Sequence, residues 1–257
     1  MKTDKRNSKT RLLIAITIIV VFAFYICWRT PLLYGDWNKQ TLYVSLLDIW
    51  YGISHDSKAH AMWIDDDGGE GILAVNRISD SLGIKPVYAI IPEKTPQQLI
   101  DSLILWQNKG AGIVLHGLRH ERWKEWDEQH IADDIEQSYS KLQQLGFDTI
   151  KILRIIVPPH ACNTRDIRKV VNNKGLQMIT GASLINPDRH IFQLGRISIT
   201  PDADTMEIRQ LLEKAYQRNN FVIFGTHSSY PDGFSKEKTL IILRMAKEIG
   251  FDFDFYE

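Results

Sequence analysis

Short apolar segments and longer amphipathic segments alternate along most of this chain. Runs in which nearly every residue is apolar, such as Pro86–Ile91 and Gly112–Leu115, predict buried strands. The segments between them have apolar residues at helical spacing, and one begins at Thr95-Pro96, a capping residue followed by a proline suited to the first helical turn. The predicted strands are Ala61–Ile64, Pro86–Ile91, Gly112–Leu115, Thr149–Val157, Leu176–Thr180, Phe221–Phe224 and the closing FDFDFYE, and the main predicted helices begin near Ile72, Thr95, Asp127, Thr164, Asp204 and Lys236.

This alternation predicts an α/β fold. About seven strand–helix units without an internal repeat suit a parallel sheet, either open or closed into a barrel. Strands that are apolar throughout, such as Pro86–Ile91, suit a sheet that is covered on both faces. In such folds the functional residues gather on the loops that follow the carboxyl ends of the strands.

The amino-terminal segment has the properties of a membrane anchor. The seventeen residues Leu12–Trp28 carry no charge, and this length is near the lower limit for a helix that crosses a bilayer. Five basic residues precede the segment and only Arg29 follows closely, so the positive-inside rule leaves the amino terminus in the cytoplasm. A cleaved signal peptide is the alternative, but no small-x-small cleavage site follows the apolar run. We therefore expect a single-pass protein of the cell membrane, with a cytoplasmic basic tail (1–11), a transmembrane anchor (12–28), a juxtamembrane segment (29–58) and a periplasmic or extracellular domain (59–257).

Composition and charge exclude several classes of protein. The chain is 44% hydrophobic and 24% charged, which is ordinary for a globular protein and unlike a disordered one. Its 31 basic and 31 acidic residues balance, but the first 30 residues hold six of the basic groups and one acid. The remainder is mildly acidic and has no basic stripe, which argues against nucleic acid as a partner. The two cysteines, Cys27 and Cys162, lie in the predicted anchor and in the body, so they form neither a disulfide pair nor a metal cluster.

Candidate catalytic residues follow several of the predicted strands. The acidic run DDDGG (65–69) follows Ala61–Ile64, His116 and His120 follow the third strand, and His227 follows Phe221–Phe224. Because the carboxyl ends of parallel strands meet at one edge, we expect these side chains to lie close together. Two imidazoles and one carboxylate with open positions form a catalytic ligand set for zinc or a similar divalent ion. A second carboxylate can then serve as general base and a further histidine as general acid.

The ordered motifs DDDGG, HGLRH, RIIVPPH and FGTH resemble those of the polysaccharide deacetylase superfamily, carbohydrate esterase family four and its divergent relatives. The resemblance extends from Ala61 to the carboxyl terminus. It implies a deformed (β/α) barrel of about seven parallel strands and a polysaccharide-deacetylase-like catalytic domain over 59–257. It also implies a divalent metal, with zinc the first choice, and an enzyme that removes N-acetyl or O-acetyl groups from an envelope or secreted polysaccharide.

The family's site residues transfer to this chain by position. His116 and His120 match its two metal-binding histidines, and His227 matches its late histidine, the expected general acid. The backbone of Pro159-His160 matches the loop that faces the oxyanion.

The three aspartates permit two registers. If the strand ends at Ile64, Asp65 is the catalytic base and Asp66 the third metal ligand, which is the assignment we prefer. If the motif is aligned on the following glycines instead, Asp66 becomes the base and Asp67 the ligand.

Two family features are displaced or missing. The family's arginine adjoins the proline pair, where this chain has Val157, so Arg154 is the candidate catalytic arginine, although a shift by an odd number of residues changes the face of a strand. The family's acidic and tryptophan segment, which orients the late histidine, has no clear match, and Asp202 and Asp204 are candidates to replace it.

The missing segment favours the alternative of a catalytically degenerate, carbohydrate- or metal-binding member. A metal-free glycosidase that uses two of the carboxylates is a third possibility, but it leaves His116 and His120 without a role.

Overall fold

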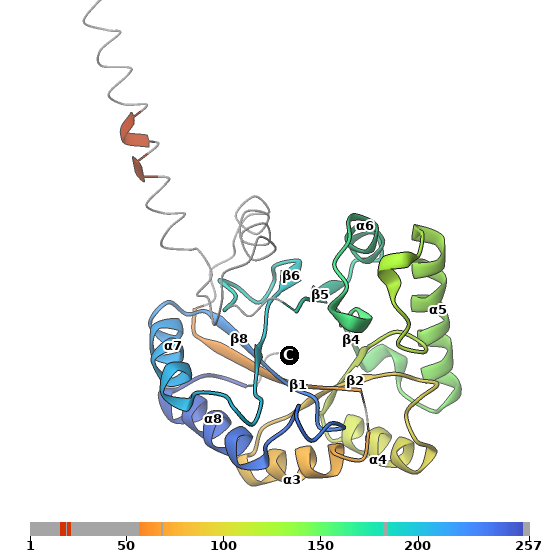
Figure 1. Cartoon of the computed structure of the whole chain (residues 1–257), viewed down its shortest axis with the longest axis horizontal. Helices are drawn as coiled ribbons and strands as arrows, with labels where there is room; N and C mark the ends of the chain where they lie inside the picture. The colour runs from red at the N-terminus through yellow and green to blue at the C-terminus, as the bar shows by residue number, and fades with distance from the viewer. Residues whose placement is uncertain (1–15, 19, 22–56, 68, 182–184, 254–257) are drawn as a thin grey trace, which may run out of the picture.

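The computed structural model describes residues 16–18, 20–21, 57–67, 69–181 and 185–253 (Figure 1). Eight strands form one sheet in which every neighbouring pair is parallel, in the order β6-β5-β4-β3-β2-β1-β8-β7. The strands are β1 (His60–Asp66), β2 (Val87–Ile90), β3 (Gly112–Leu115), β4 (Ile152–Ile156), β5 (Gln177–Ile179), β6 (Gln193–Leu194), β7 (Ile197–Ser198) and β8 (Phe221–Thr226).

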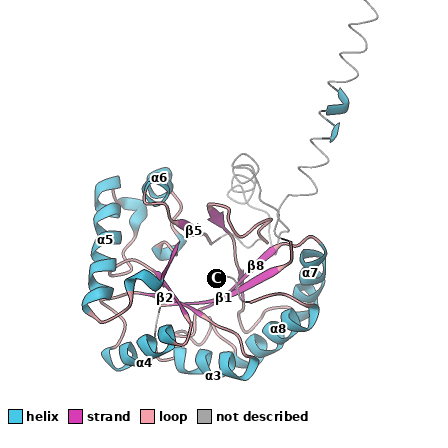
Figure 2. Cartoon of the chain, turned by 180° about the vertical axis from the view of Figure 1, so that it is seen from behind, coloured by secondary structure: helices cyan, strands magenta, loops and turns pink. Residues whose placement is uncertain are grey.

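Helices surround the outer side of the curled sheet (Figures 1 and 2). Several begin at a side-chain cap: the side chains of Thr164, Asp204 and Ser235 each accept a hydrogen bond from a backbone N–H of the following turn. Thr95, the predicted cap of the second helix, instead donates its hydroxyl to the carbonyl oxygen of Ile91. The helices are α3 (Ile72–Leu82), α4 (Gln97–Asn108), α5 (Glu128–Gln144), α6 (Arg165–Asn173), α7 (Thr205–Gln217) and α8 (Lys236–Ile249), with short 3-10 helices η1 (Trp123–Glu125), η2 (Thr149–Lys151) and η3 (Pro159–Ala161).

The two edge strands of the sheet belong to one continuous segment. β6 pairs with β5 and β7 pairs with β8, yet only Gly195 and Arg196 separate β6 from β7. The buried side chain of Asn186 fills this break, since it accepts from the Gly195 N–H at 2.7 Å and donates to the Gly195 carbonyl at 2.9 Å. The segment 193–198 therefore acts as one interrupted strand that brings the curled sheet back on itself. This architecture agrees with the expected deformed barrel of about seven parallel strands.

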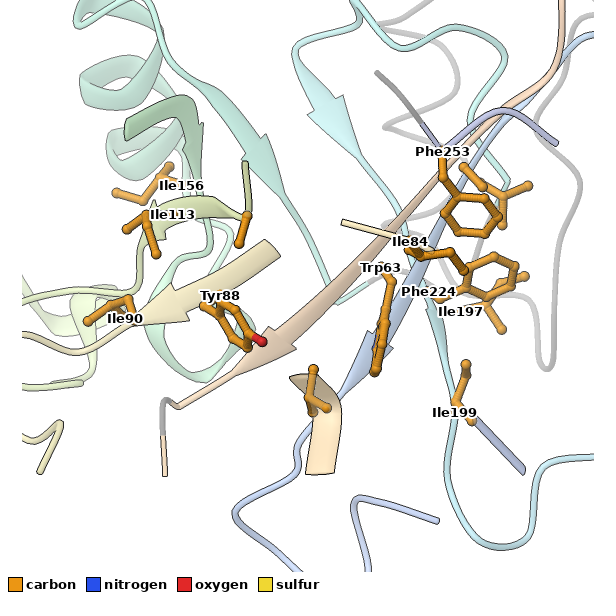
Figure 3. Packing of buried hydrophobic residues seen from close by; sticks show 14 of the residues in the cluster. Trp63, Ile84, Tyr88, Ile90, Ile113, Ile156, Ile197, Ile199, Phe224 and Phe253 are labelled. Atoms are coloured by element: carbon orange, nitrogen blue, oxygen red, sulfur yellow. The ribbon is translucent and has the colours of Figure 1, made fainter. Parts of the chain in front are cut away.

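Alternate residues of each strand face two different core layers. The inner layer consists of residues on or next to the strands, such as Met62 and Ile64, whereas the outer layer joins strands to helices. Figure 3 shows part of the outer layer, with Trp63, Tyr88 and Phe224 projecting from neighbouring strands. This alternation decides which polar side chains at the strand ends enter the barrel and which face the helices.

Several predicted strand boundaries differ from the structure, and the strands β6 and β7 were not predicted. β1 continues two residues beyond Ile64, because Asp65 and Asp66 pair with β2 as Ile64 does. At the carboxyl end, the predicted strand FDFDFYE shows one bridge, between Asp252 and His60, and residues 254–257 lie outside the described part.

The predicted tail and most of the predicted anchor and juxtamembrane segment lie outside the described residues, which include only 16–18, 20–21, 57 and 58 of this region. Among the residues that the structure describes, no helix has the length and apolar character needed to cross a membrane.

The break between β6 and β7 leads to a prediction about stability. Asn186→Ala should lower the free energy of unfolding by about 2 to 4 kcal/mol, because it leaves the buried polar groups of Gly195 without partners. The matched control is Asn76→Ala, which removes only an exposed side-chain hydrogen bond to Asp80 and should cost less than about 0.5 kcal/mol. Chemical denaturation of both variants measures the difference, and equal costs would contradict a structural role for Asn186 in the break.

Candidate active site

Three potential metal-binding atoms converge at the carboxyl ends of β1 and β3. Asp67 Oδ1 lies 3.3 Å from His116 Nε2 and 3.6 Å from His120 Nε2, and the donor atoms of the three residues all lie within 4.8 Å of one another. Two ligands of a tetrahedral zinc ion, each about 2.0–2.1 Å from the metal, are about 3.3 Å apart. Asp67 Oδ1 is also buried without a hydrogen-bond partner. The spacing and the unsatisfied oxygen both fit a divalent cation.

Backbone conformation turns these side chains toward each other. Asp67 and His120 have φ angles of 76° and 56°, in the left-handed region that Asp and His adopt more readily than most residues. His116 Nδ1 lies 2.8 Å from the carbonyl oxygen of Val157 and must donate to it, which leaves Nε2 with its lone pair free. The loop between the two histidines is fixed by Asp134, which accepts from the N–H of Leu118 at 3.0 Å.

The electrostatic environment favours the metal-binding protonation states. Burial, followed by the proximity of His116, lowers the pKa of His120 to about 4, so its imidazole is neutral at pH 7. Burial opposes ionisation of Asp67, but the neighbouring His116 holds the pKa of Asp67 below its ordinary value. Neutral imidazoles and an ionised carboxylate are the forms that ligate a cation.

Asp66 lies on the inner face of the barrel beside this cluster. Its Oδ2 accepts from Arg196 Nη1 at 2.5 Å and lies 3.2 Å from His227 Nε2, while its Oδ1 is buried without a hydrogen-bond partner. Burial favours the neutral acid, but the Arg196 charge and the hydrogen bond from His227 outweigh it and hold the pKa of Asp66 well below its usual range. The same hydrogen bond raises the pKa of His227.

Arg196 is a site residue that the sequence analysis missed. It is 7% exposed and comes from the break between β6 and β7, where no motif marks it. Its side chain passes over Gly225 of β8, where an added Cβ would lie 2.9 Å from Arg196 Cδ. The only trace of this arrangement in the sequence is a glycine in the FGTH motif at the closest approach.

The predicted catalytic arginine, Arg154, does not join the site. Ile155 and Val157 line the inner layer, so Arg154 faces the other side of β4. Its guanidinium donates instead to the carbonyl oxygens of Gly175 at 3.2 Å and Lys174 at 2.9 Å. Arg154 lies three residues before Val157, where the family has its arginine, and this odd number of residues places its side chain on the opposite face of the strand.

The preferred register of the aspartates does not fit this geometry either. Because β1 ends at Asp66 rather than Ile64, Asp65 faces the outer layer, where it accepts hydrogen bonds from Thr226 and Ser228. Burial raises the pKa of Asp65 to about 7, although these hydrogen bonds oppose the increase. The geometry matches the second register, with Asp67 beside the two histidines and Asp66 next to them.

Asp202 and Asp204 have contacts other than the expected one, and His160 lies beside the metal-binding histidines. Asp202 accepts from Thr200, and Asp204 caps α7, so the structure gives neither of them a contact with His227. His160 lies at the site rim, with its ring centroid 4.3 Å from that of His120.

Comparison with known proteins supports the resemblance seen in the motifs. Residues 54–179 match the family model described as polysaccharide deacetylase. No match was found among curated proteins.

Solved structures of carbohydrate esterases share the fold at low sequence identity. A family 4 acetyl xylan esterase from Clostridium thermocellum, in complex with a cobalt ion, has a TM-score of 0.55 at 15% identity, over 75% of this chain and 85% of that one. The catalytic domain of a peptidoglycan N-acetylglucosamine deacetylase from Eubacterium rectale has a TM-score of 0.53 at 16% identity, over 77% and 88%. A family 4 pseudoenzyme from Bacillus anthracis has a TM-score of 0.51 at 13% identity, over 77% and 64%.

The family match and the ordered motifs agree with this fold. They show that residues 54–179 are similar to the polysaccharide deacetylase superfamily.

Proposed function

We propose that this chain is a metal-dependent deacetylase that residues 12–28 anchor in the cell membrane. Its catalytic domain, on the periplasmic or extracellular side, removes N-acetyl or O-acetyl groups from an envelope or secreted polysaccharide. The observation that carries the proposal is the convergence of Asp67, His116 and His120 next to a second, independently held carboxylate, Asp66.

The chain's own residues fit a divalent cation, with zinc the first choice for two imidazoles and one carboxylate. Asp67 Oδ1 and the Nε2 atoms of His116 and His120 would hold it. When bound, a divalent cation polarises an acyl carbonyl and lowers the pKa of water, which suits a base as weakly basic as Asp66.

Asp66 and His227 supply the acid–base groups in this proposal. Arg196 keeps Asp66 ionised, and Asp66 Oδ1 is free to accept a proton from the attacking water. The raised pKa of His227 keeps its imidazole protonated closer to neutral pH, so that Nε2 can donate a proton to the leaving nitrogen or oxygen.

A degenerate member that binds carbohydrate or metal without turnover is the second candidate. The fold is shared with a family 4 pseudoenzyme, and this chain has Val157 where the family has its arginine. Arg196 argues against degeneracy, because it reaches the catalytic carboxylate from another strand. Measuring acetate release separates the two candidates, because only an active deacetylase releases acetate.

The first prediction tests metal and activity together. The purified full-length chain should release acetate from oligomers of N-acetylglucosamine or from acetylated xylan, and a chelator should abolish the release. His116→Ala and His120→Ala should each lose bound metal and activity together, because each removes one of three ligands. Full metal occupancy in both variants, measured by elemental analysis, would contradict the site, and metal binding without acetate release would favour the degenerate alternative.

The second prediction separates the two registers. Asp66→Asn should retain the metal but lower kcat by about 10²- to 10⁴-fold, because it removes the proton acceptor and not a ligand. Asp67→Asn should instead lower the affinity for the metal, because it alters a ligand. The converse result, with metal lost in the Asp66 variant and retained in the Asp67 variant, would assign the ligand to Asp66.

The third prediction uses two arginines as a matched pair. Arg196→Met should lower kcat by about 10²-fold, because Asp66 loses the charge that keeps it ionised and in place. Arg154→Met should leave kcat within about twofold, because the Arg154 guanidinium donates to backbone carbonyls on the outer side of β4, away from the site. Steady-state kinetics, with bound metal measured in parallel, compare the two variants. A larger loss of kcat in Arg154→Met than in Arg196→Met would identify Arg154 of β4 as the catalytic arginine.

A further inference from the structure

We propose that Asp65 is a positioning residue for the general acid: from the outer face of β1 it fixes the loop after β8 so that His227 points into the site. The proposal rests on the function proposed above, in which His227 donates a proton. It gives a role to Asp65, which is not part of the metal cluster. It also identifies what orients His227, since Asp202 and Asp204 have other partners.

The contacts of Asp65 lie on both sides of His227 in the sequence. Asp65 Oδ1 accepts from the Thr226 hydroxyl at 2.6 Å and from the Ser228 N–H at 3.0 Å, and Asp65 Oδ2 accepts from the Ser228 hydroxyl at 2.5 Å. The carboxyl group is fully buried, and both of its oxygens are used. One side chain therefore fixes the residue before His227 and the residue after it.

The alternation of faces turns these contacts into an orientation. Thr226, at the end of β8, and Ser228 both hydrogen-bond to Asp65 on the outer side of the sheet, whereas His227 between them reaches Asp66 on the inner side. His227 Nε2 then lies 3.2 Å from Asp66 Oδ2. Thr226 is held from a second direction, because its hydroxyl also accepts from Trp63 Nε1 at 3.0 Å.

The loop that carries Asp67 packs against the same segment. The Gly69 N–H donates to Ser229 Oγ at 2.9 Å. At Gly71 an added Cβ would lie 1.9 Å from the Ser228 carbonyl oxygen, so only glycine permits this approach. The hydrogen bonds of Asp65 are thus part of a closely packed contact between the acidic loop and the loop that bears His227.

The position of Asp65 excludes a direct chemical role. Its neighbours Asp66 and Ile64 face the inner side of the barrel, whereas Asp65 lies in the outer layer between Trp63 and Tyr88. A carboxyl group buried among aromatic side chains is costly unless hydrogen bonds compensate for the loss of water. Here three donors of the His227 loop provide that compensation, so folding of the strand end and placement of the loop are coupled.

The kinetic test compares two substitutions in the full-length chain. Asp65→Ala should lower kcat by about 10- to 100-fold while KM and bound metal stay within about twofold, because His227 is displaced and the ligands are not. Asp65→Asn keeps an acceptor for Thr226 and for the Ser228 N–H, so it should recover kcat to within about fivefold of the unmodified protein. If Asp65→Asn is as inactive as Asp66→Asn, Asp65 is the base and the proposal is overturned.

Non-additivity provides the second kinetic criterion. In the His227→Ala background, Asp65→Ala should cause no further loss of kcat, because the group that it positions is gone. An additive loss would show that Asp65 acts independently of His227. Ser228→Ala, which removes one hydrogen bond only, should give a smaller loss that is also absent in this background, and it serves if Asp65→Ala does not fold. Ser79→Ala removes a buried hydrogen bond toward the far end of α3 and is the control for a change in stability alone.

A spectroscopic test does not depend on turnover. The chain has eight histidines, so ring labelling gives a resolvable NMR spectrum in which the His227 signal is assigned by its loss in His227→Ala. Asp65→Ala should shift the His227 ring signal, Asp65→Asn should largely restore it, and the signals of His116 and His120 should stay in place. An unmoved His227 signal in Asp65→Ala overturns the positioning role, whereas a shifted signal in a protein that never releases acetate refutes only the proposed function.

Discussion

Three adjacent carboxyl groups at the end of β1 would repel one another if they shared one environment, and the site depends on how the chain separates them. Strand alternation places Asp65 in the outer layer and Asp66 inside the barrel, and a left-handed turn directs Asp67 toward His116 and His120. Each carboxyl group therefore has different partners: hydroxyl and backbone donors, a guanidinium, or two imidazoles. Position in the strand, rather than residue type, gives the three aspartates three different environments.

Closure of the sheet supplies the positive charge that this arrangement needs. The interrupted strand 193–198 brings Arg196 to Asp66 from the far edge of the sheet, across Gly225. An arginine at Val157 would reach the inner layer directly from β4, and this chain has valine there. The same electrostatic partner can thus be provided from a different strand, because all strands of a curled parallel sheet end at one rim.

Local periodicity predicted the alternating α/β organisation, and the spacing of His116 and His120 predicted that their side chains lie together. The superfamily came from the resemblance of the ordered motifs. It did not fix the register of the aspartates, because an apolar-to-polar transition marked the strand end at Ile64 while hydrogen bonding continued to Asp66. It could not identify Arg196 either, because that residue reaches Asp66 through contacts between segments 130 positions apart. Periodicity carries no information about such long-range pairs.

The charges at the inner rim leave one oxygen of Asp66 and one oxygen of Asp67 without a hydrogen-bond partner. Two carboxylates, Asp66 and Asp67, lie at this rim beside the guanidinium of Arg196, the neutral imidazole of His120 and the imidazole of His227, whose pKa the hydrogen bond to Asp66 raises. Because Arg196 and His227 both occupy Asp66 Oδ2, its Oδ1 remains available, and Asp67 Oδ1 remains available beside the histidines. A divalent cation held by Asp67, His116 and His120 would add positive charge next to the free carboxylate oxygen of Asp66. That is the electrostatic condition under which a nearby water loses a proton most readily.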